Sequence, residues 1–110
     1  MKGENLGEFE EIVLLTIAAL LEEAYSVAVC DHIAEMTGRK VKLGVVHAVL
    51  NRMEKKGYIT SELGDPTKER GGKRKRFFKI SHAGKIVLLK SKDQRDKLWN
   101  VIPQSIFQGI

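Results

Sequence analysis

The stretch LGVVHAVLNRMEKK, residues 43–56, decides the fold because its apolar residues recur at helical spacing. One face carries the large apolar side chains, which we expect to be buried: Val46, Val49, Leu50 and Met53. The opposite face carries small, hydrogen-bonding and cationic residues: Gly44, His47, Ala48, Asn51, Arg52 and Lys55. Gly57 then favours a stop. This pattern predicts a helix over residues 43–57 with an outer face able to meet a polar partner.

After Gly57 the apolar residues alternate, which is typical of strands. YITSEL (58–63) and RKRFFKI (74–80) predict two strands. The segment between them, GDPTKERGGK (64–73), contains Pro and a Gly pair and predicts a loop. Together these segments indicate a hairpin with a long basic loop.

Helices are predicted on both sides of this region. GEFEEIVLLTIAALLEE (7–23) has acids in its first turns, where the helix dipole favours them. VAVCDHIAEMT (27–37) forms a second helix, capped by Ser26 and stopped by Gly38, with a core stripe of Val29 or Cys30, Ile33, and Met36 or Thr37. Ser81 caps a last helix that runs to about Asn100, because Pro103 disfavours helix just before it.

Three helices followed by a hairpin is the order of a winged helix-turn-helix, a mostly α fold with a small β-hairpin. We expect a DNA-binding domain over residues 1–81, and a C-terminal dimerisation helix and tail over residues 82–110. A helix of this kind fits the major groove of double-stranded DNA. The basic hairpin (64–76) is the expected wing.

Several residues of the third helix have the chemistry that DNA contacts require. Asn51 can pair with adenine, Arg52 with guanine or a phosphate, and His47 with a phosphate or a base. Gly44 permits close approach of a phosphate to free backbone N–H groups. The alternative is a plain amphipathic helix whose outer face is only solvated.

The net charge of +5 is unevenly distributed. Residues 1–37 hold one Lys and eight acids, whereas residues 38–79 hold thirteen Lys or Arg against four acids. Five of these cations lie in RGGKRKR (70–76), which we expect along the DNA backbone or in the minor groove. A basic block of this kind indicates a polyanionic partner. The alternatives are a solvated surface that binds nothing and a basic hairpin whose charges keep a strand edge from aggregating.

Length and composition exclude other classes of protein. The 110 residues amount to about one domain, and the longest apolar run, Ile12–Leu21, is half of the roughly 20 residues that a membrane span needs. The acidic N-terminus has no signal-peptide pattern, and a lone cysteine fits a reducing compartment. We therefore expect a cytoplasmic protein without a membrane partner.

No pattern in the chain indicates catalysis. There is no nucleophile with a base, no glycine-rich phosphate loop and no zinc motif, and His32 and His82 fall on different elements. Cys30 is expected in the core. We expect the acids of the first helix to lie on a solvated surface: Glu10, Glu11, Glu22 and Glu23. No enzyme activity, metal or cofactor is predicted.

The C-terminal segment LWNVIPQSIFQGI (98–110) holds seven large apolar residues, more than so short a chain can bury. Such clusters mark interfaces. We expect a homodimer contact formed by Phe9, Ile12, Leu98, Trp99, Ile102, Ile106 and Phe107. The alternatives are a tail that folds back on its own subunit and a ligand pocket lined by Trp99.

Four segments together resemble the PadR family of bacterial transcriptional regulators over roughly residues 6–90. They are LGEFE leading into VLLTIAAL, AYSVAVCDHIAEMTG, GVVHAVLNRMEKKGYI and GGKRKRFFKISHAGK. The resemblance implies a homodimeric winged-helix repressor that binds a pseudo-palindromic operator. It also implies that the C-terminal helix packs on the partner's N-terminal helix, and that a small apolar or aromatic effector releases some members.

The resemblance also implies roles for particular residues. Tyr25 and Ser26 would contact phosphate, and the major groove would be faced by Lys42, Gly44, Val45, His47 and Asn51. The wing would be formed by Gly72, Lys73, Arg74, Lys75 and Arg76. The chain departs from the family where Lys42-Leu43-Gly44-Val45 replaces the common Ser-Pro-Gly-Thr, and where His47 replaces a common Tyr.

Two other functions fit the same pattern. One is a winged-helix module that applies its basic face to an acidic protein partner, and the other is a small-molecule binding protein with a vestigial DNA surface. A repressor retains DNA at physiological salt, whereas a protein-interaction module does not. A third helix hidden from solvent, together with a pocket that contains Trp99, would indicate the small-molecule binding protein.

Overall fold

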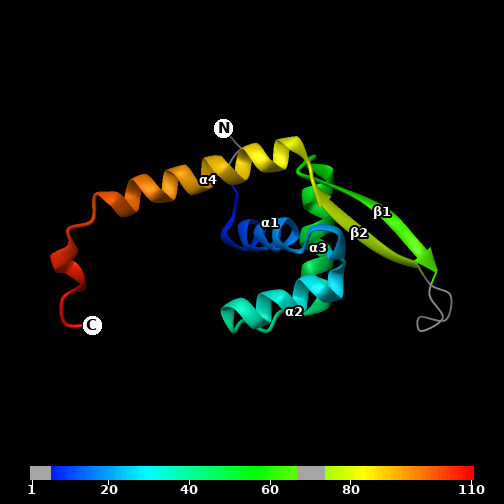
Figure 1. Cartoon of the computed structure of the whole chain (residues 1–110), viewed down its shortest axis with the longest axis horizontal. Coiled ribbons are helices and arrows are strands. Elements are labelled where there is room, and N and C mark those ends of the chain that lie inside the picture. The colour runs from blue at the N-terminus through cyan, green and yellow to red at the C-terminus, as the bar shows by residue number, and fades with distance from the viewer. Residues whose placement is uncertain (1–5, 67–73) are drawn as a thin grey trace.

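The computed structural model describes residues 6–66 and 74–110. Its elements follow the predicted order: α1 (Glu8–Leu20), η1 (Leu21–Glu23), α2 (Ser26–Thr37), α3 (Leu43–Lys55), β1 (Ile59–Pro66), β2 (Arg74–Ile80), α4 (His82–Asn100) and η3 (Gln104–Phe107). Helices α1, α2 and α3 gather in one body, from which the hairpin extends to one side and α4 to the other (Figure 1). This arrangement confirms the predicted winged helix-turn-helix.

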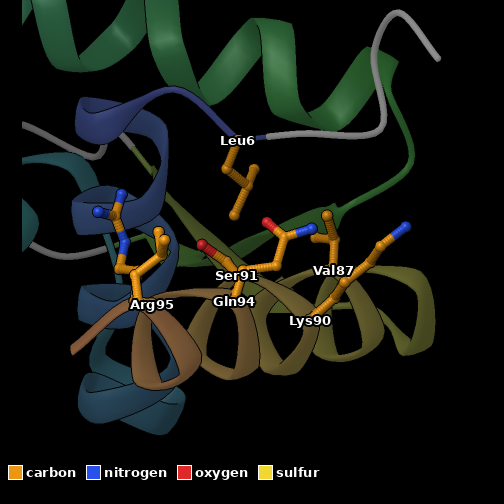
Figure 2. A pocket seen from close by; sticks show the side chains of 7 residues that line it. Leu6, Val87, Lys90, Ser91, Gln94 and Arg95 are labelled. Atoms are coloured by element: carbon orange, nitrogen blue, oxygen red, sulfur yellow. The ribbon is translucent and has the colours of Figure 1, made fainter. Parts of the chain in front are cut away.

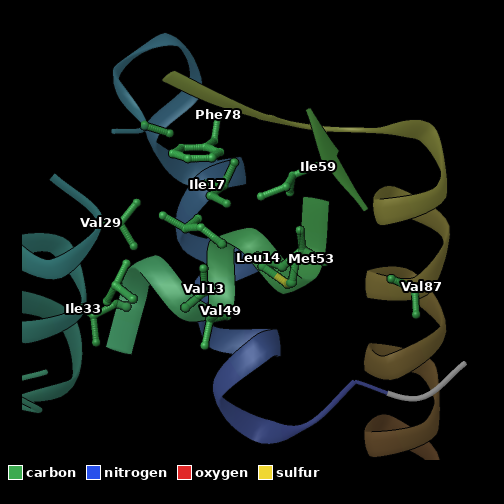
Figure 3. Close-up of a cluster of buried hydrophobic side chains, with 13 residues drawn as sticks. Val13, Leu14, Ile17, Val29, Ile33, Val49, Met53, Ile59, Phe78 and Val87 are labelled. Carbon is green, nitrogen blue, oxygen red and sulfur yellow. The ribbon is translucent and has the colours of Figure 1, made fainter. Parts of the chain in front are cut away.

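The core lies between α1, α2 and α3, and the hairpin closes one end of it. The four apolar residues predicted to be buried on α3 are all buried, and its opposite face is exposed. They meet Val13, Leu14 and Ile17 of α1, while Ile59 and Phe78 cover the cluster from the strands (Figure 3). The helical period of residues 43–55 therefore set the face that packs.

The hairpin is longer than its alternating pattern predicted. β1 pairs antiparallel with β2 from Ile59↔Ile80 to Pro66↔Arg74, with an irregularity between Leu63 and Pro66. Placing residues 64–66 in the loop was therefore wrong. The pairing with β2 carries β1 through Gly64 to Pro66, and the Phe77 ring lies close to Gly64, where a Cβ would stand 2.6 Å from that ring. The rest of the predicted loop, residues 67–73, lies outside the described residues.

The start of α2 differs from the prediction. Ser26 is the first helical residue and not the cap; Tyr25 occupies the cap position, and no side chain caps the helix. The preceding backbone is held by β2 instead, because Phe78 N–H donates to the Ala24 carbonyl over 2.8 Å and Tyr25 bridges Phe77. Backbone contacts with β2 thus hold the residues before α2, while the helix itself starts without a side-chain cap.

The apolar stripe of α2 is shorter than predicted. Val29 and Ile33 are buried, whereas Met36 and Thr37 are exposed on its last turn. Cys30 packs partly against the core, and burial, with a smaller effect from the Asp31 carboxylate, raises the pKa of its thiol. The sulfur is therefore protonated at neutral pH, as suits a packing residue.

α4 begins at the predicted cap and packs closely against the hairpin. Gly84 N–H donates to Ser81 Oγ over 3.1 Å, and the same hydroxyl donates to the Gly57 carbonyl. A Cβ at Gly84 would collide with the Tyr58 carbonyl oxygen. Only glycine therefore allows α4 to approach the start of β1 this closely.

The end of α4, beyond Arg95, leaves the body of the molecule (Figure 1). Val87 is its last buried residue, and beyond Leu88 none of its residues packs against the core cluster. Past its end the chain turns away from the helix (Figure 1), and the rings of Trp99 and Phe107 stack with centroids 6.0 Å apart. Apart from this ring contact, the tail leaves much apolar surface exposed.

Within residues 6–66 and 74–110, no helix combines the length and the apolar character needed to cross a bilayer.

Candidate nucleic-acid interface

A groove forms where the start of α2, the outer flank of α3 and strand β2 meet. It measures about 350 Å³ and is also lined by Val27, Leu43 and Phe78. Seven of the residues predicted to contact DNA line it: Tyr25, Ser26, His47, Asn51, Arg74, Lys75 and Arg76. Residues up to 51 positions apart in the sequence therefore share one surface.

Aromatic and cationic contacts hold the wing against α2. The Lys75 ammonium lies 4.0 Å from the centroid of the Tyr25 ring, and that ring meets Phe77 edge-on at 5.6 Å. Cation–π contacts of this kind add to the attraction between the two segments. The Tyr25 side chain thus holds Lys75 of β2 beside the α2 N-terminus.

Two wing arginines are ordered by hydrogen bonds within the hairpin. Arg74 Nε donates to the Gly64 carbonyl over 2.6 Å, and Arg76 Nη1 donates to Ser61 Oγ over 3.0 Å. Each bond uses one donor of a guanidinium that carries five. Among the described residues no other hydrogen bond uses these two guanidinium groups, so their remaining donors can meet an anionic ligand.

The first turn of α3 is open to solvent. Lys42 occupies its N-cap position, and Gly44 and Val45 are exposed. No atom lies within 4 Å of the place where a Gly44 Cβ would stand, so the fold itself does not require glycine there. Gly72 and Lys73, the other predicted wing contacts, lie outside the described part of the chain.

Arg52 is bound to α1. Its Nε donates to Glu10 Oε2 over 2.9 Å, and Lys56 Nζ donates to the same oxygen over 3.0 Å. Glu10 is only 7% exposed, so the prediction that it lies on a solvated surface was wrong. The helical period contained the missed signal, because Glu10 shares a face with the buried residues Val13, Leu14 and Ile17.

The environment of Glu10 keeps it ionised. Burial alone would raise its pKa, but hydrogen bonds from Arg52, the Gly7 N–H and Lys56 outweigh that effect and lower the pKa to about 2. Two cationic side chains, Arg52 and Lys56, thus face one carboxylate. The cluster therefore carries a net charge of +1 beside the outer face of α3.

The other acids of α1 bind different elements. Glu11 accepts a two-pronged contact from Arg95 of α4, with Nη2 to Oε1 at 2.6 Å and Nε to Oε1 at 2.9 Å. Glu8 pairs with Arg39 on the α2–α3 connection. The prediction of a solvated surface is also wrong for Glu11, whose side chain is 12% exposed, whereas Glu22 and Glu23 are exposed.

The residues predicted at a dimer contact form two groups. Phe9 and Ile12 of α1 are partly buried against the core of their own chain. Leu98, Trp99, Ile106 and Phe107 are exposed, and Ile102 is partly exposed. The exposed group projects beyond the body on the end of α4 and the tail (Figure 1).

Two hollows lie along α4. Figure 2 shows the first, about 210 Å³, where Leu6 faces Val87, Ser91 and Arg95. It is smaller than the 300–1,000 Å³ of ordinary ligand pockets. The second, about 500 Å³, is lined by Trp99, Asn100, Ile102, Gln104 and Phe107. The latter is the hollow with room for a small aromatic molecule.

Metal-ligating side chains do not converge in the part of the chain that the structure covers. No group of three or more His, Cys, Asp or Glu among those residues is placed to hold an ion. The groove instead offers hydrogen-bonding and cationic groups.

A helix with an open outer face, a helix start and a basic hairpin that share one groove define a winged helix-turn-helix protein of the transcription-regulator class. The sequence profile of the Transcriptional regulator PadR-like family matches residues 14–90. The chain belongs to this family, which confirms the resemblance seen in its sequence.

Solved structures show the same fold. A PadR-like transcriptional regulator from Bacillus cereus is 20% identical with a TM-score of 0.72, covering 93% of both chains. A PadR family transcription regulator from Clostridium difficile R20291 is 21% identical with a TM-score of 0.70, covering 89% of this chain and 98% of that one. A PadR family regulator from Eggerthella lenta is 21% identical with a TM-score of 0.68, covering 93% of this chain and 88% of that one. No curated protein matches the chain.

Proposed function

We propose that this protein is a transcriptional repressor that binds a pseudo-palindromic operator in double-stranded DNA as a homodimer. The groove carries the proposal, because it joins the α3 side chains suited to base edges with the cations suited to phosphates. In this proposal residues 1–81 bind DNA and residues 82–110 form the dimer.

The groove suggests how the contacts are divided. His47 and Asn51 lie on the exposed flank of α3, where short polar side chains can reach base edges in the major groove. Tyr25 and Ser26 at the α2 N-terminus, with Lys42 at the start of α3, would contact phosphates. The wing cations Arg74, Lys75 and Arg76 follow the backbone or enter the minor groove.

Dimerisation is proposed from the exposed apolar surface of α4 and the tail. Trp99 is 63% exposed and Ile106 67% exposed, although both are large apolar residues. Surfaces of this kind ordinarily meet a partner. A second copy that packs its α1 and α4 against this surface would bury it, and would place two α3 helices on one DNA molecule.

Repression requires only that the dimer occupy promoter DNA, so no catalytic group is needed. The hollow beside Trp99 is the proposed place for a small apolar effector, since its volume lies in the range of ligand pockets. The chain has one tryptophan, so quenching of its fluorescence by an added aromatic compound would report on this hollow directly.

Selection of bound sequences from a random DNA pool tests the proposal. We expect a palindromic motif with half-sites about one helical turn apart. With roughly six to ten phosphate contacts, affinity should fall by about 10³ to 10⁵ between about 50 and 200 mM salt. A chain that retains no DNA at physiological salt but binds an acidic protein through the same groove would contradict the proposal and favour the protein-interaction alternative.

A further inference from the structure

The Glu10 carboxylate is held rigidly between α1 and α3. Its Oε1 accepts the Gly7 N–H over 3.0 Å, and its Oε2 accepts both Arg52 Nε and Lys56 Nζ. The side chain is almost fully buried and is charged at neutral pH. Such a carboxylate is a fixed acceptor, because neither its position nor its charge can adjust without loss of these bonds.

Arg52 uses only one donor in this contact. Its Nε faces Glu10, no hydrogen bond within residues 6–66 and 74–110 involves its two terminal nitrogens, and its side chain is half exposed. The two terminal nitrogens form the planar fork that binds guanine O6 and N7, or two phosphate oxygens, with a pair of parallel hydrogen bonds. A bond at Nε sets the orientation of this fork without occupying it.

We propose that Glu10 is a positioning residue for DNA recognition, which holds the Arg52 guanidinium so that its fork meets a pair of acceptor atoms on DNA. The proposal rests on the DNA-binding function proposed above. Preorganisation of a long side chain removes part of the entropy that binding would otherwise lose. Glu10 therefore acts on DNA affinity through Arg52 from a second helix, without touching DNA itself.

Charge screening is the competing interpretation. If Glu10 only neutralised Arg52 and Lys56, its removal would release two cations toward DNA and raise affinity for every sequence, with a steeper salt dependence. Positioning predicts the opposite sign. Whether DNA affinity rises or falls when Glu10 is replaced therefore distinguishes charge screening from positioning.

The experiment compares Glu10→Gln with Glu8→Gln on the full chain, using the DNA sequence that the wild-type protein selects. Both variants remove one α1 carboxylate, but the Glu8 pair with Arg39 is exposed and lies on the α2–α3 connection. We expect Glu10→Gln to bind about tenfold more weakly and Glu8→Gln to bind as the wild type does. Affinities are expressed per folded protein, measured by circular dichroism, so that lost stability does not count as lost binding.

Arg52→Lys supplies a readout that a purely structural ion pair would not move. Lysine keeps the charge but lacks both Nε and the fork. We expect Arg52→Lys alone, Glu10→Gln alone and the double variant to lose DNA affinity to the same extent. Loss of discrimination at one base pair identifies guanine as the ligand, and an equal loss for all sequences with a salt slope lower by about 0.9 identifies phosphate.

Different results would contradict the proposed DNA-binding function and the positioning role of Glu10. A wild-type chain that selects no DNA overturns the proposed function itself. A wild-type chain that selects a motif, with a Glu10→Gln variant that binds it equally well or more tightly, overturns only the positioning role. Additive losses in the double variant would also overturn it, because independent contacts add.

Discussion

Among single side chains, Glu10 shows how packing changes the meaning of a residue. On α1 it is one of three acids that look alike in the sequence, yet among them only Glu10 binds two cations, Arg52 of α3 and Lys56 at the C-cap of that helix. Its neighbours Glu8 and Glu11 bind the α2–α3 connection and α4. The acidic N-terminal region thus connects α1 to three other parts of the fold.

The lowered pKa of Glu10 predicts acid sensitivity. Because its pKa is about 2 in the folded state and 4.5 as the ordinary value, its contribution is complete above about pH 4.5 and is lost as the pH falls toward 2. The full effect is on the order of 3 kcal/mol. Urea unfolding at several pH values should show this loss in the wild type and a smaller loss in Glu10→Gln; parallel curves for the two proteins would contradict it.

Gly84 should be intolerant of a side chain. Gly84→Ala places a Cβ against the Tyr58 carbonyl, so α4 must shift away from the hairpin, and we expect a loss of about 1–3 kcal/mol of unfolding free energy. Gly44→Ala is the matched control, since its Cβ would meet open space in another helical first turn. Thermal unfolding of both variants checks this, and equal stabilities would contradict the packing argument.

Among the elements, α3 and β2 contribute different kinds of contact to the groove. α3 offers His47 and Asn51 on an exposed flank, and β2 offers cations ordered by Tyr25, Ser61 and the Gly64 carbonyl. A helix suits base edges, and a cationic strand suits phosphates. Substitutions in the two elements should therefore affect binding differently.

Lys75→Ala should weaken binding to all DNA sequences by a similar factor and lower the salt slope by about 1, because one phosphate contact is lost. Asn51→Ala is the contrasting variant, which should relax the preference at one base pair and leave the salt slope nearly unchanged. Titration of matched and mismatched DNA at two salt concentrations measures both effects. If the two variants gave the same profile, base readout by α3 would be wrong.

The molecule as a whole is elongated, with extents of 57 × 33 × 21 Å, because α4 continues beyond the core. A single chain leaves the apolar end of α4 in water. A second copy of the chain that covered the end of α4 would explain this shape. The hairpin lies away from it, so a second copy there would leave the groove open (Figure 1).

Leu98→Ser should weaken dimerisation, with dissociation at protein concentrations where the wild type stays dimeric. Met36→Ser is the matched control, because both residues are 68% exposed but Met36 lies on the last turn of α2. Sedimentation equilibrium of both variants measures the difference. A monomeric wild type, or equal dissociation of the two variants, would count against the α4 contact.

Local patterns predicted most of the fold. The boundaries of α3, the start of α4 at Ser81 and the strand β2 agree with the sequence to within about two residues, since helical period, capping and alternation are properties of neighbouring residues. The prediction failed at Gly64–Pro66 and at Ser26, where contacts with Phe77 and Phe78 decide the local structure.

By itself, then, the sequence determined the order of the elements, the buried stripe of α3 and the basic character of the wing. Tertiary structure alone decided that Tyr25 meets Lys75, and that Glu10 binds Arg52 and Lys56, 42 and 46 positions away. The physical reason is the distance along the chain over which each kind of interaction acts. Periodicity acts between residues a few positions apart, whereas the partner of a buried charge depends on which helix packs across from it.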